Sequence, residues 1–465
     1  MSHRTRLFPG TFLIAWFLLP LMPAASASAQ TKVSPQFSDS PPSQQNRTAS
    51  EPFDEDEKAP QRVADDSARY DVIYDVRILP TERAAHVRIR VGAHGNTIRQ
   101  LTFHIDPDRH LQVQGAGALE VKDEYVTWSP PPKGGKLEYV FRIDHLRDER
   151  RYDAKSAENW ALFRADDLVP PVRARFADGA KSISRLRLRL PKGWKAALPY
   201  AREADGMYRI DDAKRAFDRP KGWMLVGRIN VLRTRIQGMQ VTVAAPHKSA
   251  FRRNDLIALL RWNLPGAREL LGRLPDRLLI VGADDPMWRG GLSGPDSFFI
   301  HSARPLIDED YTSPPLHELV HALMHARAGH DGDWVVESLA EYYSLELLRR
   351  SRSISKSAYR RSARKLAKKA ENALSLRVAH ADGAVTAKGV LVLQSLDEEI
   401  RSRTADRFGL DDVFRMCVED DSPMTTDGFR SLAEKTTGLD LRAFFETHAP
   451  KPGPSFANED VAAKK

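Results

Sequence analysis

Residues 311–345 read YTSPPLHELVHALMHARAGHDGDWVVESLAEYYSL, and this stretch decides the fold of the chain. His317 and His321 lie four residues apart in HELVH, and residues at this spacing share one face of a helix. Two imidazoles on one face can bind the same metal ion, and Glu318 can reach a water on that ion. The H-E-x-x-H pattern therefore predicts a helix that carries two metal ligands and a general base.

The residues around HELVH favour this helix. Ser313 can cap its N-terminus, Pro314 suits its first turn, and apolar residues follow at helical spacing. A motif with three fixed positions also arises by chance, and a buried helix can carry two histidines for packing. HELVH by itself therefore leaves both interpretations open.

The second part of the stretch, WVVESLAEYYS from Trp334 to Ser344, offers a third ligand. We expect a helix here, capped by Asp333. Glu337 follows His321 by sixteen residues, and a catalytic zinc takes three protein ligands and an open position for water. Glu341 lies one turn further on, where its carboxylate can accept the N–H of a ligand histidine. The alternative is that both glutamates are solvated carboxylates on the helix surface.

HELVH followed by WVVESLAEYY resembles the pattern of the gluzincin zinc metallopeptidases, the aminopeptidase N-like and thermolysin-like clan. The resemblance is closest to the bacterial glycyl aminopeptidase family, and it includes the segment 388–404 and the C-terminal helices. It implies one zinc ion per chain, held by His317, His321 and Glu337. It also implies hydrolysis of a peptide or protein substrate by a zinc-activated water, with Glu318 as the general base.

One departure from the family concerns the strand that binds substrate. In the family, a glycine-rich edge strand pairs with the substrate backbone and leads to a glutamate that holds the substrate's amino group. The corresponding residues here are Gly290, Gly291, Leu292 and Ser293, and the glutamate is missing. Asp296 is a candidate substitute, so the resemblance leaves aminopeptidase and endopeptidase action open.

A second departure concerns the oxyanion donor. The family places a tyrosine two residues before a Lys-Gly pair, and Thr386 occupies that position in this chain. The two departures support a second hypothesis, in which the chain is a zinc-stabilised, non-catalytic protein that binds peptides or cell-envelope partners.

The N-terminus has the pattern of a signal peptide. Arg4 and Arg6 precede an apolar run over residues 7–21, and Ala-Ser-Ala at 27–29 suits a cleavage site. The run is shorter than the ~20 residues that a spanning helix needs. We therefore predict that residues 1–29 are removed, that the mature chain has no stable membrane span, and that it is exported to a bacterial periplasm or secreted. An uncleaved anchor is the alternative.

The remaining pattern predicts an α+β fold. Short alternating segments over residues 69–244 indicate an antiparallel β-rich N-terminal domain. The resemblance implies a thermolysin-like catalytic domain over 245–350, followed by a helical C-terminal part over 351–450. Polar residues 30–68 and the tail 451–465 have the composition of disordered segments. The lone Cys417 lies in an apolar helical pattern and is expected to be a buried thiol.

The chain of 465 residues has a net charge of +9. Ten lysines and arginines and no acid occur in 349–369, a stretch that could attract a polyanion. No nucleic-acid-binding motif accompanies it, so we expect a solvated helix face and no nucleic-acid partner. AHVRIRV (85–91) and RLRLRL (185–190) place arginines on one face of a strand. A solvated face is the simpler interpretation, and a binding surface is the alternative. The sequence leaves the oligomeric state open.

Overall fold

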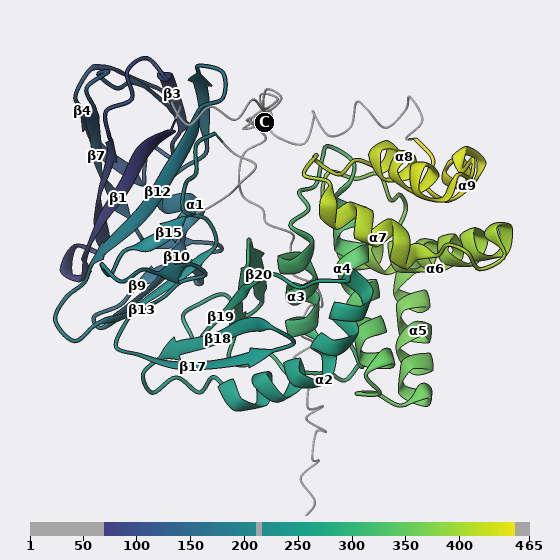
Figure 1. The fold of residues 1–465 in the computed structure, drawn as a ribbon. Coiled ribbons are helices and arrows are strands. Elements are labelled where there is room, and N and C mark those ends of the chain that lie inside the picture. The colour runs from purple at the N-terminus through teal and green to yellow at the C-terminus, as the bar shows by residue number, and fades with distance from the viewer. Residues whose placement is uncertain (1–68, 211–215, 452–465) are drawn as a thin grey trace, which may run out of the picture. The chain divides into compact units, whose positions relative to one another are not determined.

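The computed structural model describes residues 69–210 and 216–451 (Figure 1). The predicted signal peptide, the predicted linker and the tail beyond residue 451 lie outside these residues. Strands dominate from residue 69 to residue 301, with the helix α2 among them, and helices follow from residue 314. The predicted α+β class, with a β-rich N-terminal region and a helical C-terminal part, is confirmed.

A seven-stranded sheet has the order β14-β15-β12-β1-β2-β7-β4. Its strands are β1 (Arg69–Leu79), β2 (Ala84–Val91), β4 (His110–Gly115), β7 (Gly135–Arg142), β12 (Lys181–Arg189), β14 (Ala201–Arg202) and β15 (Tyr208–Ile210). The expectation of purely antiparallel pairing is wrong at one position, because β1 and β12 run parallel. Strands of this sheet and of other sheets lie between β1 and β12 in the sequence, so no hairpin dictates their relative direction.

Two smaller sheets belong to the same β-rich region. One has the order β11-β3-β6-β5 and the other β13-β16-β10-β9-β8. Their strands are β3 (Ile98–His104), β5 (Ala118–Lys122), β6 (Tyr125–Ser129), β8 (His145–Leu146), β9 (Tyr152–Ser156), β10 (Trp160–Arg164), β11 (Val172–Phe176), β13 (Lys195–Ala197) and β16 (Trp223–Gly227), and the short helices are η2 (Pro80–Glu82) and α1 (Ala165–Leu168). Tyr74 of the seven-stranded sheet packs with Phe103 and Trp128 of the four-stranded sheet in a shared apolar core.

A fourth sheet positions the candidate site. Its order is β17-β18-β19-β21-β20, with β17 (Ile229–Ile236), β18 (Met239–Pro246), β19 (Arg277–Ala283), β20 (Gly291–Gly294) and β21 (Ser297–His301). Strands β18, β19 and β21 are parallel, and α2 (Arg253–Leu271) connects β18 to β19 as parallel pairing requires. Strand β20 lies at the edge of the sheet and beside α3.

Helices make up the rest of the described chain. They are α3 (Pro314–Met324), α4 (Asp333–Arg350), α5 (Lys356–Ala370), α6 (Gly383–Thr404), α7 (Leu410–Glu419), α8 (Thr426–Thr437) and α9 (Arg442–His448). Within residues 69–210 and 216–451, no helix has the length and apolar character needed to cross a membrane. Cys417 on α7 is fully buried as expected, and burial raises the pKa of its thiol to about 12.

The two helices predicted around the H-E-x-x-H motif are present, but one of their caps differs. The Ser313 hydroxyl accepts the backbone N–H of Leu316, as predicted, and Pro314 begins α3. The prediction that Asp333 caps α4 is wrong, because Gly332 occupies that position and Asp333 is the first helical residue. The Asp333 carboxylate instead accepts the backbone N–H of Ala381 at 2.8 Å, ahead of α6.

One carboxylate holds together the arginines on the water-facing side of the seven-stranded sheet. The Asp75 side chain is only 4% exposed and accepts two hydrogen bonds of 2.7 Å from the Arg189 guanidinium. The guanidinium groups of Arg90 and Arg187 lie 3.7 and 3.9 Å from the same carboxylate. The hydrogen bonds from Arg189 lower the pKa of Asp75 despite its partial desolvation.

We expect Asp75→Asn to lower the free energy of unfolding by about 1–2 kcal/mol at neutral pH, since it removes charge-assisted hydrogen bonds. Because the folded-state pKa is depressed, this contribution is present above the unfolded pKa of about 3.9 and disappears as pH falls through the folded pKa. Denaturant unfolding of both proteins across this pH range should show their difference shrinking in acid. Asp71→Asn, at a carboxylate that is 54% exposed, should have a smaller effect. If the difference in unfolding free energy between the natural chain and Asp75→Asn did not change with pH, the ionised Asp75 carboxylate would not be the stabilising group.

Candidate functional site

Three predicted side chains from α3 and α4 converge on one point. The Nε2 atoms of His317 and His321 are 3.0 Å apart. The Glu337 carboxylate lies 3.4 Å from the Nε2 of His317 and 3.5 Å from the Nε2 of His321. Two imidazole nitrogens and the carboxylate of Glu337 thus face one another, and this group could hold a metal ion.

The spacing and chemistry of these donors fit zinc. Donor atoms bound to a tetrahedral zinc at roughly 2.0–2.2 Å lie about 3.3–3.6 Å from one another. The distances of 3.0, 3.4 and 3.5 Å among the three side chains are close to this range. Two imidazoles and one carboxylate are also the ligand set of zinc hydrolases.

Glu341 orients the first of these histidines. Its Oε2 lies 3.0 Å from the Nδ1 of His317, so the imidazole N–H can donate to the carboxylate while Nε2 faces the other donors. Burial alone would lower the pKa of His317, but hydrogen bonds to Glu337 and Glu341 raise it well above its ordinary value. Burial likewise opposes ionisation of Glu337, but the charges of the two histidines and their hydrogen bonds hold the pKa of this carboxyl well below its usual range.

Glu318 is buried next to this group, with 5% of its surface exposed. Burial raises the pKa of its carboxyl above the usual value, and the nearby charges of His317 and His321 partly offset this. The side chain of Glu318 lies next to Gly291 of β20. A Cβ atom at residue 291 would lie 2.6 Å from the Oε1 of Glu318, so the glycine makes room for the carboxylate.

If Glu318 takes part in turnover, Gly291→Ala should lower kcat by roughly tenfold to a hundredfold, because the added methyl displaces a reacting group. The fold should persist, since the clashing atoms belong to a side chain that can move. The matched control is Gly266→Ala on α2, where the nearest atom to an added Cβ is 3.5 Å away. Steady-state kinetics and melting temperatures of the three proteins test this. Equal activity of both variants would contradict a functional contact between Gly291 and Glu318.

The four predicted substrate-strand residues lie on or beside β20. The carbonyl of Gly290 accepts the backbone N–H of His301 at 2.9 Å, and Leu292 is largely buried. Trp223 of β16 binds this region from the β-rich side. Its indole N–H donates to the carbonyl of Leu292 at 2.8 Å, and its backbone N–H donates to the Ser297 hydroxyl at 2.9 Å. Both β21 and Trp223 of β16 therefore hold β20 in place by hydrogen bonds.

Asp296, the candidate substitute for the missing glutamate, has a partner of its own. It lies in the turn between β20 and β21, and its Oδ1 is 3.2 Å from the Nε2 of His325. His325 ends α3 in the left-handed conformation, with φ of 55°. Its side chain therefore leaves the helical face that carries His317 and His321 and pairs with the Asp296 carboxylate.

Thr386 is held within its own helix. Its hydroxyl donates to the carbonyl of Asp382 at 2.9 Å, and its carbonyl accepts a hydrogen bond from the Ser338 hydroxyl at 3.2 Å. The hydroxyl groups of two tyrosines near the motif have partners elsewhere. Tyr343 is buried, with its hydroxyl 3.3 Å from the Asp411 carboxylate, and the Tyr311 hydroxyl accepts a hydrogen bond from Arg361.

The charges of two arginines that the sequence analysis did not identify interact with the charge of Glu318. The charge of Arg304, shortly after β21, partly offsets the effect of burial on the pKa of Glu318. Burial lowers the pKa of Arg147, and the charges of Asp153 and Glu318 partly offset this effect. The Arg147 guanidinium also lies 4.5 Å from the centre of the Trp288 ring, just before the glycine pair. Neither arginine belongs to a motif. A bridge between Tyr152 of β9 and Met287 brings the region after Arg147 to the segment that precedes β20.

The basic stretch 349–369 covers the end of α4 and most of α5. Several of its charges have acidic or aromatic partners within the fold. Arg349 and Arg350 bind Glu346, Arg350 also binds Asp411, and Lys365 pairs with Asp310. These contacts agree with the interpretation of a solvated helix face.

No protein-family model matches the sequence, and no curated protein does either. Solved structures do match in their fold. The aminopeptidase N family protein from Idiomarina loihiensis aligns with a TM-score of 0.64 at 14% identity, over 82% of this chain and 76% of that one. This chain has an aminopeptidase N-like fold. At this identity the likeness extends to the fold alone.

A second structure of similar fold is Legionella pneumophila aminopeptidase A, solved in complex with aspartic acid. It aligns with a TM-score of 0.55 at 12% identity and covers 81% of this chain. The chain spans about half the length of the Legionella enzyme, 49%.

Proposed function

We propose that this protein is an exported, zinc-dependent metallopeptidase of the gluzincin type. The observation that carries the proposal is the convergence of His317, His321 and Glu337 within 3.0–3.5 Å, with Glu318 buried beside them. The aminopeptidase N-like fold agrees with this chemistry. Export rests on the signal-peptide pattern of residues 1–29.

In this proposal His317, His321 and Glu337 hold one zinc ion, and Glu341 keeps His317 in the tautomer that leaves Nε2 free to bind. Zinc bound there would acidify a water and polarise the scissile carbonyl. Glu318 accepts the proton of that water and then donates it to the leaving amine. Its raised pKa suits both steps, because a base whose pKa lies closer to neutrality can also return the proton.

The substrate backbone would pair with β20. The strand is at the sheet edge, where main-chain groups can bind an extended peptide. Gly290, Gly291, Leu292 and Ser293 would form this surface, and the contact of Gly291 with Glu318 brings it beside the base. Ser293 supplies no carboxylate for a free amine, and Asp296 is paired with His325. We therefore propose cleavage of internal peptide bonds as the main activity.

One observation favours a second candidate function. The Thr386 hydroxyl donates to Asp382 and so is not directed at an oxyanion. Loss of one such donor costs about 3 kcal/mol of transition-state stabilisation. A zinc-stabilised protein that holds peptides or envelope partners without cleaving them would retain the three ligands and lack this donor.

The test uses the mature chain from Gln30 onward, loaded with zinc and incubated with a mixed peptide library. Mass spectrometry of the products separates internal cuts from stepwise N-terminal trimming. Activity should disappear when a chelator removes the metal and return when zinc is added. Zinc-dependent peptide binding without any product would refute the peptidase and support the second candidate.

A further inference from the structure

The water-facing side of the seven-stranded sheet carries an unusual excess of positive charge. Strand register places alternate residues of β15, β12, β1, β2 and β7 on this side. Among the described residues of these five strands, it bears eleven lysines and arginines against three carboxylates. This face therefore carries an excess of eight positive charges.

The charges are ordered in rows that cross the strands. The central row alternates in sign, with Arg187, Asp75, Arg88 and Glu138 as successive neighbours. Asp75 binds Arg189 of a flanking row as well, and Glu138 accepts a hydrogen bond from Arg88. This row is largely neutralised within the protein.

The two rows on either side of it are basic. One runs through Arg209, Arg185, Ile73, Arg90 and Lys136. The other runs through Arg189, Arg77 and His86. Neighbouring strands are about 4.8 Å apart, so each row offers cationic groups at roughly that interval or a small multiple of it.

Like charges that face each other across strands destabilise a sheet. Here Arg185 lies opposite Arg209, Arg90 opposite Lys136, and Arg77 opposite Arg189. Several of these cations also have carboxylate partners within the sheet, since Arg185 binds Asp71, Lys136 pairs with Glu138 and Arg189 binds Asp75. These pairs neutralise only part of the positive charge of the two rows. An anionic ligand that lies along a row would offset the repulsion.

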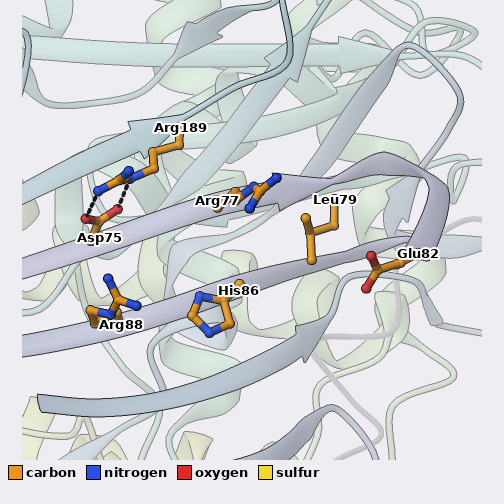
Figure 2. A pocket seen from close by; sticks show the side chains of 7 residues that line it. All are labelled: Asp75, Arg77, Leu79, Glu82, His86, Arg88 and Arg189. Atoms are coloured by element: carbon orange, nitrogen blue, oxygen red, sulfur yellow. Dashed lines mark hydrogen bonds and ion pairs between the residues drawn. The ribbon is translucent and has the colours of Figure 1, made fainter.

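A hollow of about 420 Å³ lies over this surface (Figure 2). Arg77, His86 and Arg88 border it, with Leu79, the carboxylate of Glu82 and the Asp75–Arg189 pair. Figure 2 shows that Arg77 and His86 stand on adjacent strands, β1 and β2. The hollow can admit a charged group of a ligand between the basic side chains.

We propose that this basic sheet face binds a linear acidic polysaccharide, whose carboxylates recur along the chain and pair with the two rows of cations. The described strands place no Phe, Tyr or Trp on this face, so it lacks the stacking platforms that single-stranded nucleic acids use. Ile183 is its one strongly exposed large apolar residue in those strands, which gives little to insert into a membrane. Guanidinium groups bind carboxylates in paired hydrogen bonds.

The experiment measures binding of fluorescein-labelled alginate oligomers to the full chain at several salt concentrations. The test variant, Arg77→Gln with Arg90→Gln and Arg185→Gln, removes one cation from the second row and two from the first. The control variant, Arg360→Gln with Arg364→Gln and Lys368→Gln, removes three exposed charges from α5. Affinity should fall roughly tenfold to a hundredfold in the test variant only, and should weaken as salt rises.

Equal losses in both variants, or no binding by the natural chain, would overturn the proposal. Tighter binding to vesicles of phosphatidylglycerol and phosphatidylcholine, or to a DNA oligonucleotide, would also overturn it, since the occupant would then be of another class. Melting temperatures verify that the variants fold. If the triple variant does not fold, Arg77→Gln alone should still lower the affinity measurably, and an unchanged affinity would reject the site.

Discussion

Replacing Glu318 with glutamine should reduce peptide hydrolysis by roughly a thousandfold or more, while zinc stays bound. Glutamine keeps the shape of the side chain but cannot accept a proton from water. The carboxylate is 5% exposed and touches the space beside Gly291, so a solvent base cannot easily take its place. The measurement is kcat/KM on a cleaved peptide, together with the zinc content of the purified variant.

The matched control is Glu346→Gln on α4. Glu346 is also 5% exposed, but it faces Arg349 and Arg350 rather than the three converging side chains. This variant should retain activity, even if its melting temperature falls. If Glu318→Gln cleaves as fast as the natural chain, Glu318 is not the general base and the proposed mechanism fails.

Replacing Glu337 with alanine should weaken zinc binding by more than about a hundredfold, a larger loss than removal of an outer partner of a ligand causes. The change deletes one of three donors and leaves His317 and His321, whose Nε2 atoms are 3.0 Å apart, without the carboxylate between them. Competition with a chromophoric chelator measures the affinity directly, and hydrolysis at limiting zinc should disappear in parallel.

Glu341→Gln provides the comparison for this variant. Its carboxylate meets the Nδ1 of His317, on the far side of the imidazole from the converging atoms. We expect a loss of zinc affinity of about ten- to a hundredfold, smaller than that of Glu337→Ala. The reverse order of the two effects would mean that Glu341, and not Glu337, completes the ligand set.

The shared face of the two histidines could be predicted from local helical spacing, and the resemblance to a family pattern supplied Glu337 as the third member of the group. Helical spacing places His317 and His321 on one face of α3. The same spacing of four residues places Glu337 and Glu341 on one face of α4. The prediction that Asp333 caps α4 was wrong because of a contact that is distant in the sequence. Its carboxylate binds the N–H of Ala381, a residue far along the chain that local signals do not reveal.

Long-range pairing explains what else the sequence did not predict. Alternation predicted the β-rich character of the N-terminal region, but the parallel pairing of β1 with β12 depends on how the intervening strands pack. Arg147 lies far from Glu318 in the sequence, so no local signal reveals that their charges interact. The arginines of β2 and β12 were visible as two alternating runs, and only the strand register shows that they form continuous rows.

The hydrogen bonds of Trp223 restrict how this protein could be divided or recombined. A fragment that starts at residue 245 would lose β17 and most of β18, and so would expose an edge of β19. A fragment that starts at Ile229 keeps the whole sheet but loses the indole that binds the carbonyl of Leu292. If the helical part were fused to an unrelated domain, β20 would therefore lose the contact with Trp223 that anchors it. The contact is kept only when both parts are inherited together.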